Sequence, residues 1–194
     1  MFSTFDELLR NNPDLKRRHD LISKVGAESE RGMTVLVAAE LDRALEVLLK
    51  SYLAPGKARD HLFSGSTPPL GSFSTKINVA RVLHLIREDE YELLHLIRRI
   101  RNEFAHNPNA AFSDARISSW MKAIPENETE SNTKSKFTLC SVELIAELEA
   151  DAVRDANGRV YEESFNTYHR RGYDHDVPPF NSAEEAAAAY KAVS

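Results

Sequence analysis

Apolar residues recur at spacings of three and four along most of the chain, which is the period of an α-helix with one buried face. Glycine, which weakens helices, is sparse, with seven among 194 residues. The pattern therefore predicts an all-α fold. The predicted helices cover about 4–10, 14–24, 28–53, 74–86, 89–106, 113–123 and 142–155, followed by an alanine-rich helix at 186–193.

Three of these helices carry a clear apolar stripe, and the residues between the stripes are mostly charged or polar. Such stripes face a common core, so the central helices are expected to pack against one another as a bundle. The predicted core positions are Leu41, Leu45, Leu48 and Tyr52 in the first helix, Ile77, Val82, Leu85 and Ile86 in the second, and Leu93, Ile97, Ile100 and Phe104 in the third.

Two segments interrupt the helical pattern. Residues 54–73 hold three of the eight prolines and three of the seven glycines, which predicts an ordered loop. Residues 125–136 have almost no apolar side chains and predict a flexible excursion. The pair Asn157-Gly158 predicts the end of the helix that begins near Val142.

The charge and cysteine content narrow the possible functions. The formal net charge is −5, which argues against a chain that coats nucleic acid with lysine and arginine. The single cysteine, Cys140, excludes an internal disulfide and a cysteine-based zinc site. No apolar run approaches the ~20 residues that span a bilayer, and the first residues lack a signal segment, so we expect a cytoplasmic protein without membrane contact.

Basic residues are nevertheless concentrated in one part of the chain. Between Ser51 and Ala110, lysine and arginine number 8 against 6 acids, whereas between Glu126 and Glu163 there are 10 acids against 4 bases. The positive charge could therefore form a local basic cleft. Its members are Lys76, Arg81, Arg87, Arg98, Arg99 and Arg101.

The sharpest candidate for chemistry is the end of the helix predicted at 89–106. Arg101, Asn102 and His106 combine a permanent cation, an amide and an imidazole, which suits phosphodiester cleavage. Five residues of continuous helix would, however, separate Arg101 from His106 by about 140°. The alternative is a purely structural helix end, where the helix dipole favours histidine and asparagine is a common terminator.

Other patterns are weaker candidates. The Gly65–Gly71 loop lacks the Gly-Lys-Ser/Thr end of a phosphate-binding loop and is better explained as a turn that packs Phe63, Leu70 and Phe73. The Glu28–Arg31 cluster predicts either a helix-start ion network or one wall of a cleft. We expect no metal and no cofactor, because the spacing of the metal-compatible residues matches no zinc motif. These residues are His169, Asp174, His175 and Asp176.

Four segments together resemble the mannitol operon repressor family, MtlR or MltR. The segments are Glu28-Ser29-Glu30-Arg31-Gly32, Leu41-Asp42-Arg43-Ala44-Leu45-Glu46, Leu62-Phe63-Ser64-Gly65 with Pro69-Leu70-Gly71-Ser72-Phe73-Ser74 and Lys76, and Ile100-Arg101-Asn102-Glu103-Phe104-Ala105-His106. This resemblance implies an all-helical regulator that lacks an obvious DNA-reading motif and acts through a regulatory protein partner.

The Arg-x4-His element also resembles the motif of the HEPN superfamily, whose active members are metal-independent ribonucleases that act as dimers. That resemblance implies catalytic Arg101 and His106, a supporting Asn102 and an RNA substrate. Many HEPN-like proteins are non-catalytic.

The sequence therefore predicts a single-domain, HEPN-like helical bundle over residues 1–194, with a family-like core at about 25–123 and a less well-defined C-terminal part at 139–194. The favoured hypothesis is a homodimeric transcriptional regulator that works by protein contacts, without enzymatic activity and without direct DNA binding. The ribonuclease with Arg101, Asn102 and His106 in a dimer cleft is the alternative. A third hypothesis is a small-molecule sensor with a pocket beside residues 62–74.

Overall fold

The structure is a computed structural model that describes residues 4–124 and 132–170, with side chains described over 7–124 and 132–154. Within these residues the chain forms helices and no strand, which confirms the predicted all-α fold. The helices are α1 (Thr4–Asn11), α2 (Pro13–Ala27), α3 (Glu30–Tyr52), α4 (Lys57–Phe63), α5 (Phe73–Val82), α6 (Glu88–His106), α7 (Ala115–Met121) and α8 (Thr133–Arg170).

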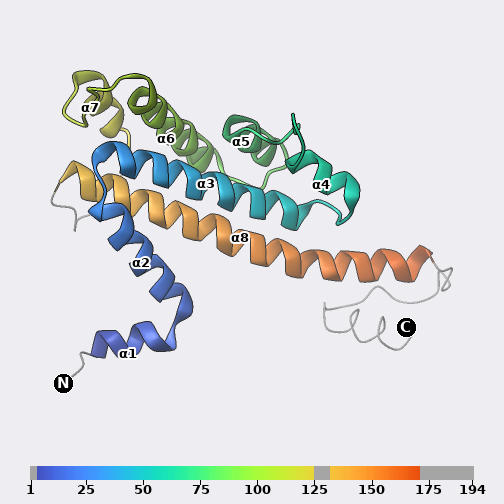
Figure 1. The fold of residues 1–194 in the computed structure, drawn as a ribbon. Helices are drawn as coiled ribbons and strands as arrows, with labels where there is room; N and C mark the ends of the chain where they lie inside the picture. Colours follow the sequence, from blue (N-terminus) through green and yellow to red (C-terminus); the bar gives the residue numbers. More distant parts are fainter. Residues whose placement is uncertain (1–3, 125–131, 171–194) are drawn as a thin grey trace.

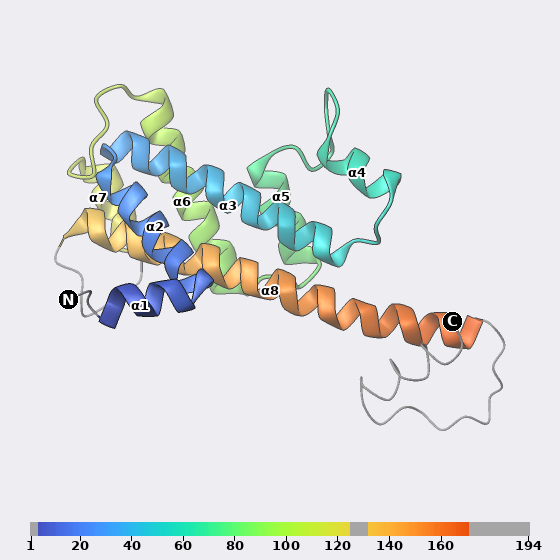
Figure 2. The ribbon, with the colours of Figure 1, turned by 60° about the horizontal axis from the view of Figure 1, so that its bottom comes forward.

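Helices α3 and α8 lie side by side in both views of the molecule (Figures 1 and 2) and share its most extensive helix contact. Helix α6 packs against α3, and α5 packs against both α3 and α6. Helix α2 packs against α8, α1 against α2, and α7 against α6. The core therefore lies around α3, which α8, α6 and α5 cover.

The apolar stripe of α3 fills this core. Leu41, Leu45 and Leu48 are completely buried, as the spacing predicts. Tyr52 is 42% exposed, so its assignment to the core is wrong. Helix α3 ends at this residue, and the completely buried Leu49 fills the core at the same turn. In α6 the predicted positions Ile97, Ile100 and Phe104 are buried, and Leu93 is partly buried.

Helix α5 is shorter than predicted. Ser72 is its N-cap, and the Ser72 hydroxyl accepts a hydrogen bond from the backbone N–H three residues later. The helix ends at Val82, which is 77% exposed and not part of the core. Just beyond it, His84 adopts a left-handed conformation with φ of 57°, and the N–H of Leu85 donates to the carbonyl oxygen of Ala80 at 2.9 Å. This arrangement is a Schellman motif, which stops a helix abruptly.

Two predicted irregular segments contain helix. Residues 57–63 form α4 inside the predicted loop, because a helix of seven residues is too short to show a period. Helix α8 begins at Thr133, inside the predicted excursion, since the Asn132 side chain caps it by accepting from Ser135 N–H at 2.9 Å. It also continues past Asn157-Gly158, so the predicted stop is wrong. One glycine costs a helix only about 1 kcal/mol, which neighbouring turns outweigh.

The packed turn before α5 is confirmed. Leu70 is buried, and Phe63 and Phe73 are partly buried against the core. Several other predictions lie outside the described residues. These are the excursion at 125–131, the alanine-rich helix at 186–193, and the metal-compatible side chains of His169, Asp174, His175 and Asp176.

Candidate functional site

Helix α6 carries all three candidate catalytic residues. It begins with a capping box, in which the Glu90 carboxylate accepts from the backbone N–H of Arg87 at 2.7 Å. Three acids in its first turn complement the helix dipole. The helix remains regular through His106 and ends at Asn107, because a residue before proline avoids the helical conformation.

The C-terminal end of α6 is held by Arg31 from the first turn of α3. The Arg31 guanidinium donates to the carbonyl oxygen of Phe104 and, at 2.7 Å, to that of Asn107. The neighbouring Glu30 carboxylate accepts from the backbone N–H of Phe112 at 2.8 Å. In the described part of the chain, Glu30 and Arg31 form no ion pair. The ion-network prediction is therefore wrong, because these side chains bind backbone groups that a helix end leaves unpaired.

The regular helix keeps Arg101 and His106 apart. Arg101 donates to the Asn102 side chain at 3.1 Å, and both Arg101 and His106 are exposed. Arg101 lines a cavity between α3, α5 and α6, whereas His106 lines a larger groove beside α7 and α8. Asn102 lines both. Arg101 and His106 of one chain therefore open onto different hollows, which share Asn102.

The larger hollow is a groove of about 980 Å³ that follows α6 from Arg87 to His106. Helices α7 and α8 supply its other borders. Apolar side chains, among them Leu93, Leu96 and Leu144, line the groove together with charged side chains. We call it the α6 groove. Apolar and charged groups side by side are typical of surfaces that bind other molecules.

The two ends of the α6 groove differ in charge. Near the start of α6, the exposed acids Glu143 and Glu147 of α8 line it, and Glu147 Oε2 lies 3.7 Å from Arg87 Nη2. Near α7, the Arg99 and Arg116 guanidinium carbons lie 5.5 and 5.0 Å from the centroid of the Trp120 ring. Such cation–π contacts hold two positive charges close together.

His95 lies one helical turn before Arg98 and Arg99 on α6, and their charge affects its pKa. Burial, and then repulsion from these two cations, lowers the pKa of His95 below its ordinary value. The ring Nε2 is 3.2 Å from the Asn78 side-chain oxygen. Repulsion from the two arginines thus adds to burial in disfavouring the charged form of His95.

The smaller cavity has a volume of about 420 Å³ and lies between α3, α5 and α6. The small-molecule hypothesis requires a pocket beside residues 62–74. The cavity meets this requirement, because residues of that segment form one side of it. Arg98 and Asn102 line both this cavity and the α6 groove. The cavity is lined by Val35, Ala38, Ala39, Asp42, Ser72, Phe73, Ser74, Arg98, Arg101 and Asn102.

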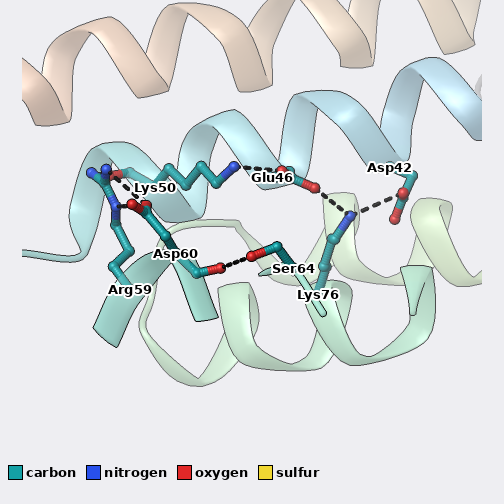
Figure 3. Close-up of polar contacts among 7 residues, drawn as sticks. All are labelled: Asp42, Glu46, Lys50, Arg59, Asp60, Ser64 and Lys76. Carbon is teal, nitrogen blue, oxygen red and sulfur yellow. Dashed lines mark hydrogen bonds and ion pairs between the residues drawn. The ribbon is translucent and has the colours of Figure 1, made fainter. Parts of the chain in front are cut away.

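One residue of the predicted basic cluster is structural. Lys76 is only 4% exposed, and its Nζ lies 2.9 Å from both Asp42 Oδ2 and Glu46 Oε2 (Figure 3). Glu46 also accepts from Lys50 at 2.6 Å. Burial opposes the charge of Glu46, but hydrogen bonds from Lys50 and Lys76 outweigh it and hold the Glu46 pKa below its ordinary value. The i, i+4 spacing of Asp42 and Glu46 was the available sequence signal for this site.

Among the described residues, no group of histidine, cysteine, aspartate and glutamate side chains gathers to hold a metal ion. In that same part of the chain, no helix combines the length and apolar character needed to cross a membrane.

Comparison with known proteins supports the fold. No protein-family model matches the chain, and no curated protein matches its sequence. Among solved structures, a chain from the X-ray structure of the MtlR-HPr complex from Escherichia coli is similar, with a TM-score of 0.56. The two are 19% identical, and the match covers 68% of this chain and 98% of that chain. The bundle of this protein is therefore the fold found in that structure.

Proposed function

We propose that this protein is a transcriptional regulator of the mannitol operon repressor type that acts by binding other proteins. The observation that carries the proposal is the likeness of its fold to a chain of the MtlR-HPr complex, which is itself an assembly of two proteins. The sequence segments that resemble the mannitol operon repressor family support the same assignment. A protein partner is also consistent with the net charge of −5, which disfavours extensive contact with DNA phosphates.

The α6 groove is the surface we propose for this partner. Its apolar lining can exclude water, while its charged rim can fix the orientation of a bound protein. Trp120 is the anchor we expect to matter most, because tryptophan and arginine dominate the energy of many protein interfaces. In this groove Trp120 is partly exposed and lies between Arg99 and Arg116.

Calorimetric titration of the full chain with an HPr protein tests the proposal. We expect binding by the unmodified protein and at least a tenfold loss of affinity in Arg99→Glu, because that change reverses a charge beside Trp120. Lys57→Glu makes the same charge change on α4, away from the α6 groove, and should bind as before. Absence of HPr binding would overturn this partner, and equal binding by both variants would overturn the surface.

The regulator is also proposed to be a homodimer, as its resemblance to HEPN-like proteins implies. Light scattering at micromolar concentration should give twice the chain mass of 21.9 kDa. A monomer at that concentration would contradict the dimer without affecting the proposed protein partner.

The ribonuclease alternative requires a second chain. Within one chain, Arg101 and His106 line different hollows, so a catalytic site would have to combine residues across a dimer cleft. The geometry of the chain does not favour this alternative, and the RNA measurement described below separates it from the regulator.

A further inference from the structure

We propose that the cavity between α3, α5 and α6 is a binding site for a small anionic ligand that carries a phosphate or carboxylate group. This proposal does not depend on the proposed protein-docking surface, although Arg98 and Asn102 line both hollows. Its volume of about 420 Å³ lies within the ~300–1,000 Å³ usual for small-molecule pockets. Val35, Ala38 and Phe73 give it an apolar part, and polar groups are concentrated along α6 and at the start of α5.

Arg98 lines the cavity from α6. Its Nε atom is buried and has no hydrogen-bond partner among the described residues. Buried donors in folded proteins are almost always paired, so the Arg98 guanidinium keeps capacity to donate to a further acceptor. The fork of a guanidinium matches the two oxygens of a carboxylate or phosphate.

The side chains that line the cavity carry more positive than negative charge. Arg101 lines it as well, and among the described residues the Arg101 guanidinium contacts no acid, only the Asn102 amide at 3.1 Å. Among the described residues, Asp42 is the sole acid in the lining, and its Oδ2 is already paired with Lys76 at 2.9 Å. The lining therefore holds two arginines and one carboxylate, and Lys76 already balances the charge of that carboxylate. Because the remaining charge is positive, the cavity favours an anion.

The start of α5 adds donors to the same side. The Ser72 hydroxyl caps the N–H of Thr75, but the N–H groups of Phe73 and Ser74 belong to the first turn and have no acceptor in the described part of the chain. The positive end of the α5 dipole also lies at this point. These backbone groups supplement the two arginines, which carry the assignment.

Asp42 further restricts the class of ligand that fits the cavity. Asp42 lines the cavity, and its buried Oδ1 atom lacks a hydrogen-bond partner in the described residues. A ligand hydroxyl would donate to this oxygen, whereas a bare anion would leave it unpaired. The site should therefore prefer an anion with a neighbouring hydroxyl group.

This use of Arg101 differs from the nuclease hypothesis. In the anion site Arg101 works beside Arg98, and His106 takes no part because it does not line the cavity. Replacing His106 should abolish RNA cleavage if the nuclease exists, but should leave anion binding unchanged.

In the experiment, the full chain is titrated with small-molecule probes at low ionic strength. Binding is monitored by NMR through the chemical shifts of the backbone amides. The first probe, glycerol 3-phosphate, has a phosphate group and neighbouring hydroxyl groups. Inorganic phosphate provides only the anion, and glycerol provides only hydroxyl groups. We expect saturable shifts at the Phe73 and Ser74 amides, with glycerol 3-phosphate binding more tightly than phosphate and glycerol not binding. Absence of saturable shifts with either anion would overturn the site.

Matched variants test which residues bind. Arg98→Gln should weaken binding of glycerol 3-phosphate at least tenfold, whereas Arg154→Gln, the same change on an exposed residue of α8, should not. Arg101→Gln changes an exposed side chain, so it provides a second test if the half-buried Arg98 proves necessary for folding. Equal weakening in Arg154→Gln would show non-specific attraction and overturn the site. Equal affinity for phosphate and glycerol 3-phosphate would overturn the role of Asp42.

Discussion

Arg31 Nη2 lies 2.7 Å from the carbonyl oxygen of Asn107, so the first turn of α3 holds the last turn of α6. The same guanidinium also donates to the carbonyl oxygen of Phe104. These carbonyls belong to the end of a helix, where no further turn can satisfy them. The arginine in the Glu-Ser-Glu-Arg segment thus fixes the position of the helix end that carries His106.

Replacing Arg31 should therefore destabilise the fold. We expect Arg31→Met to lower the free energy of unfolding by about 1.5–3 kcal/mol, the range for hydrogen bonds to a charged group. Denaturant unfolding monitored by circular dichroism measures the change. Arg116→Met, at a side chain that is 70% exposed, should cost less than about 0.5 kcal/mol. A similar loss in both variants would contradict the role given to Arg31.

Lys76 should matter far more than Lys50, although both bind Glu46. Removing the buried Lys76 leaves Asp42 and Glu46 without their shared partner, so Lys76→Met should cost about 2 kcal/mol. Lys50 is 37% exposed, and Lys50→Met should cost less than about 1 kcal/mol. Urea unfolding of the two variants under identical conditions makes the comparison. Equal losses would show that burial of Lys76 adds nothing.

The lowered pKa of Glu46 predicts a loss of stability in acid. The unfolded chain takes up a proton at Glu46 near the ordinary value of 4.5, before the folded chain does, so stability falls as pH decreases below about 4.5. The Glu46→Gln variant has no carboxyl group to take up this proton. The stability difference between the unmodified protein and Glu46→Gln should therefore be constant above this pH and shrink below it. A difference that stays constant to lower pH would contradict the prediction.

Replacing His84 with glycine should stabilise the protein. Left-handed backbone costs a residue with a side chain roughly 1–2 kcal/mol, and the exposed His84 ring has no hydrogen bond in the described structure to offset it. Glycine adopts this conformation freely but loses more entropy on folding. We expect His84→Gly to raise the free energy of unfolding by about 0.5–1 kcal/mol and His84→Val to lower it. Thermal unfolding should rank the three proteins in that order, and any other order would disprove it.

Purified protein should leave RNA intact in the presence of EDTA. The regular end of α6 places Arg101 and His106 at different hollows of the same chain, so one chain does not set the proton-transferring imidazole and the phosphate-binding cation in one hollow. Gel analysis of RNAs of varied sequence is the measurement. Cleavage that disappears in both Arg101→Ala and His106→Ala would establish the ribonuclease alternative.

The sequence predicted the fold well where a long period was present. The stripes of α3 and α6 identified Leu41, Leu45, Ile97 and Phe104 as core residues because their helices are long enough to repeat the pattern several times. Short or polar elements lack such a signal. Helix α4 has only seven residues, and the first turn of α8 is polar and depends on its cap at Asn132.

The candidate site shows a different limit. Sequence spacing placed Arg101, Asn102 and His106 on one helix, and it indicated that a continuous helix would separate Arg101 from His106. It could not show that Arg31 binds the end of that helix, because the two lie more than seventy residues apart in the chain. Lys76 was grouped with exposed cations for the same reason, since its partners are on α3.

The pairing of α3 with α8 also has a consequence for folding while the protein is synthesised on the ribosome. Helix α3 ends at Tyr52, and α8 begins at Thr133, so the chain between them must be synthesised before this side of α3 is covered. At roughly 5–20 residues per second, that interval lasts several seconds. During this time part of the leucine-rich face of α3 lacks its native neighbour, and such exposed apolar surface makes a nascent chain prone to aggregation.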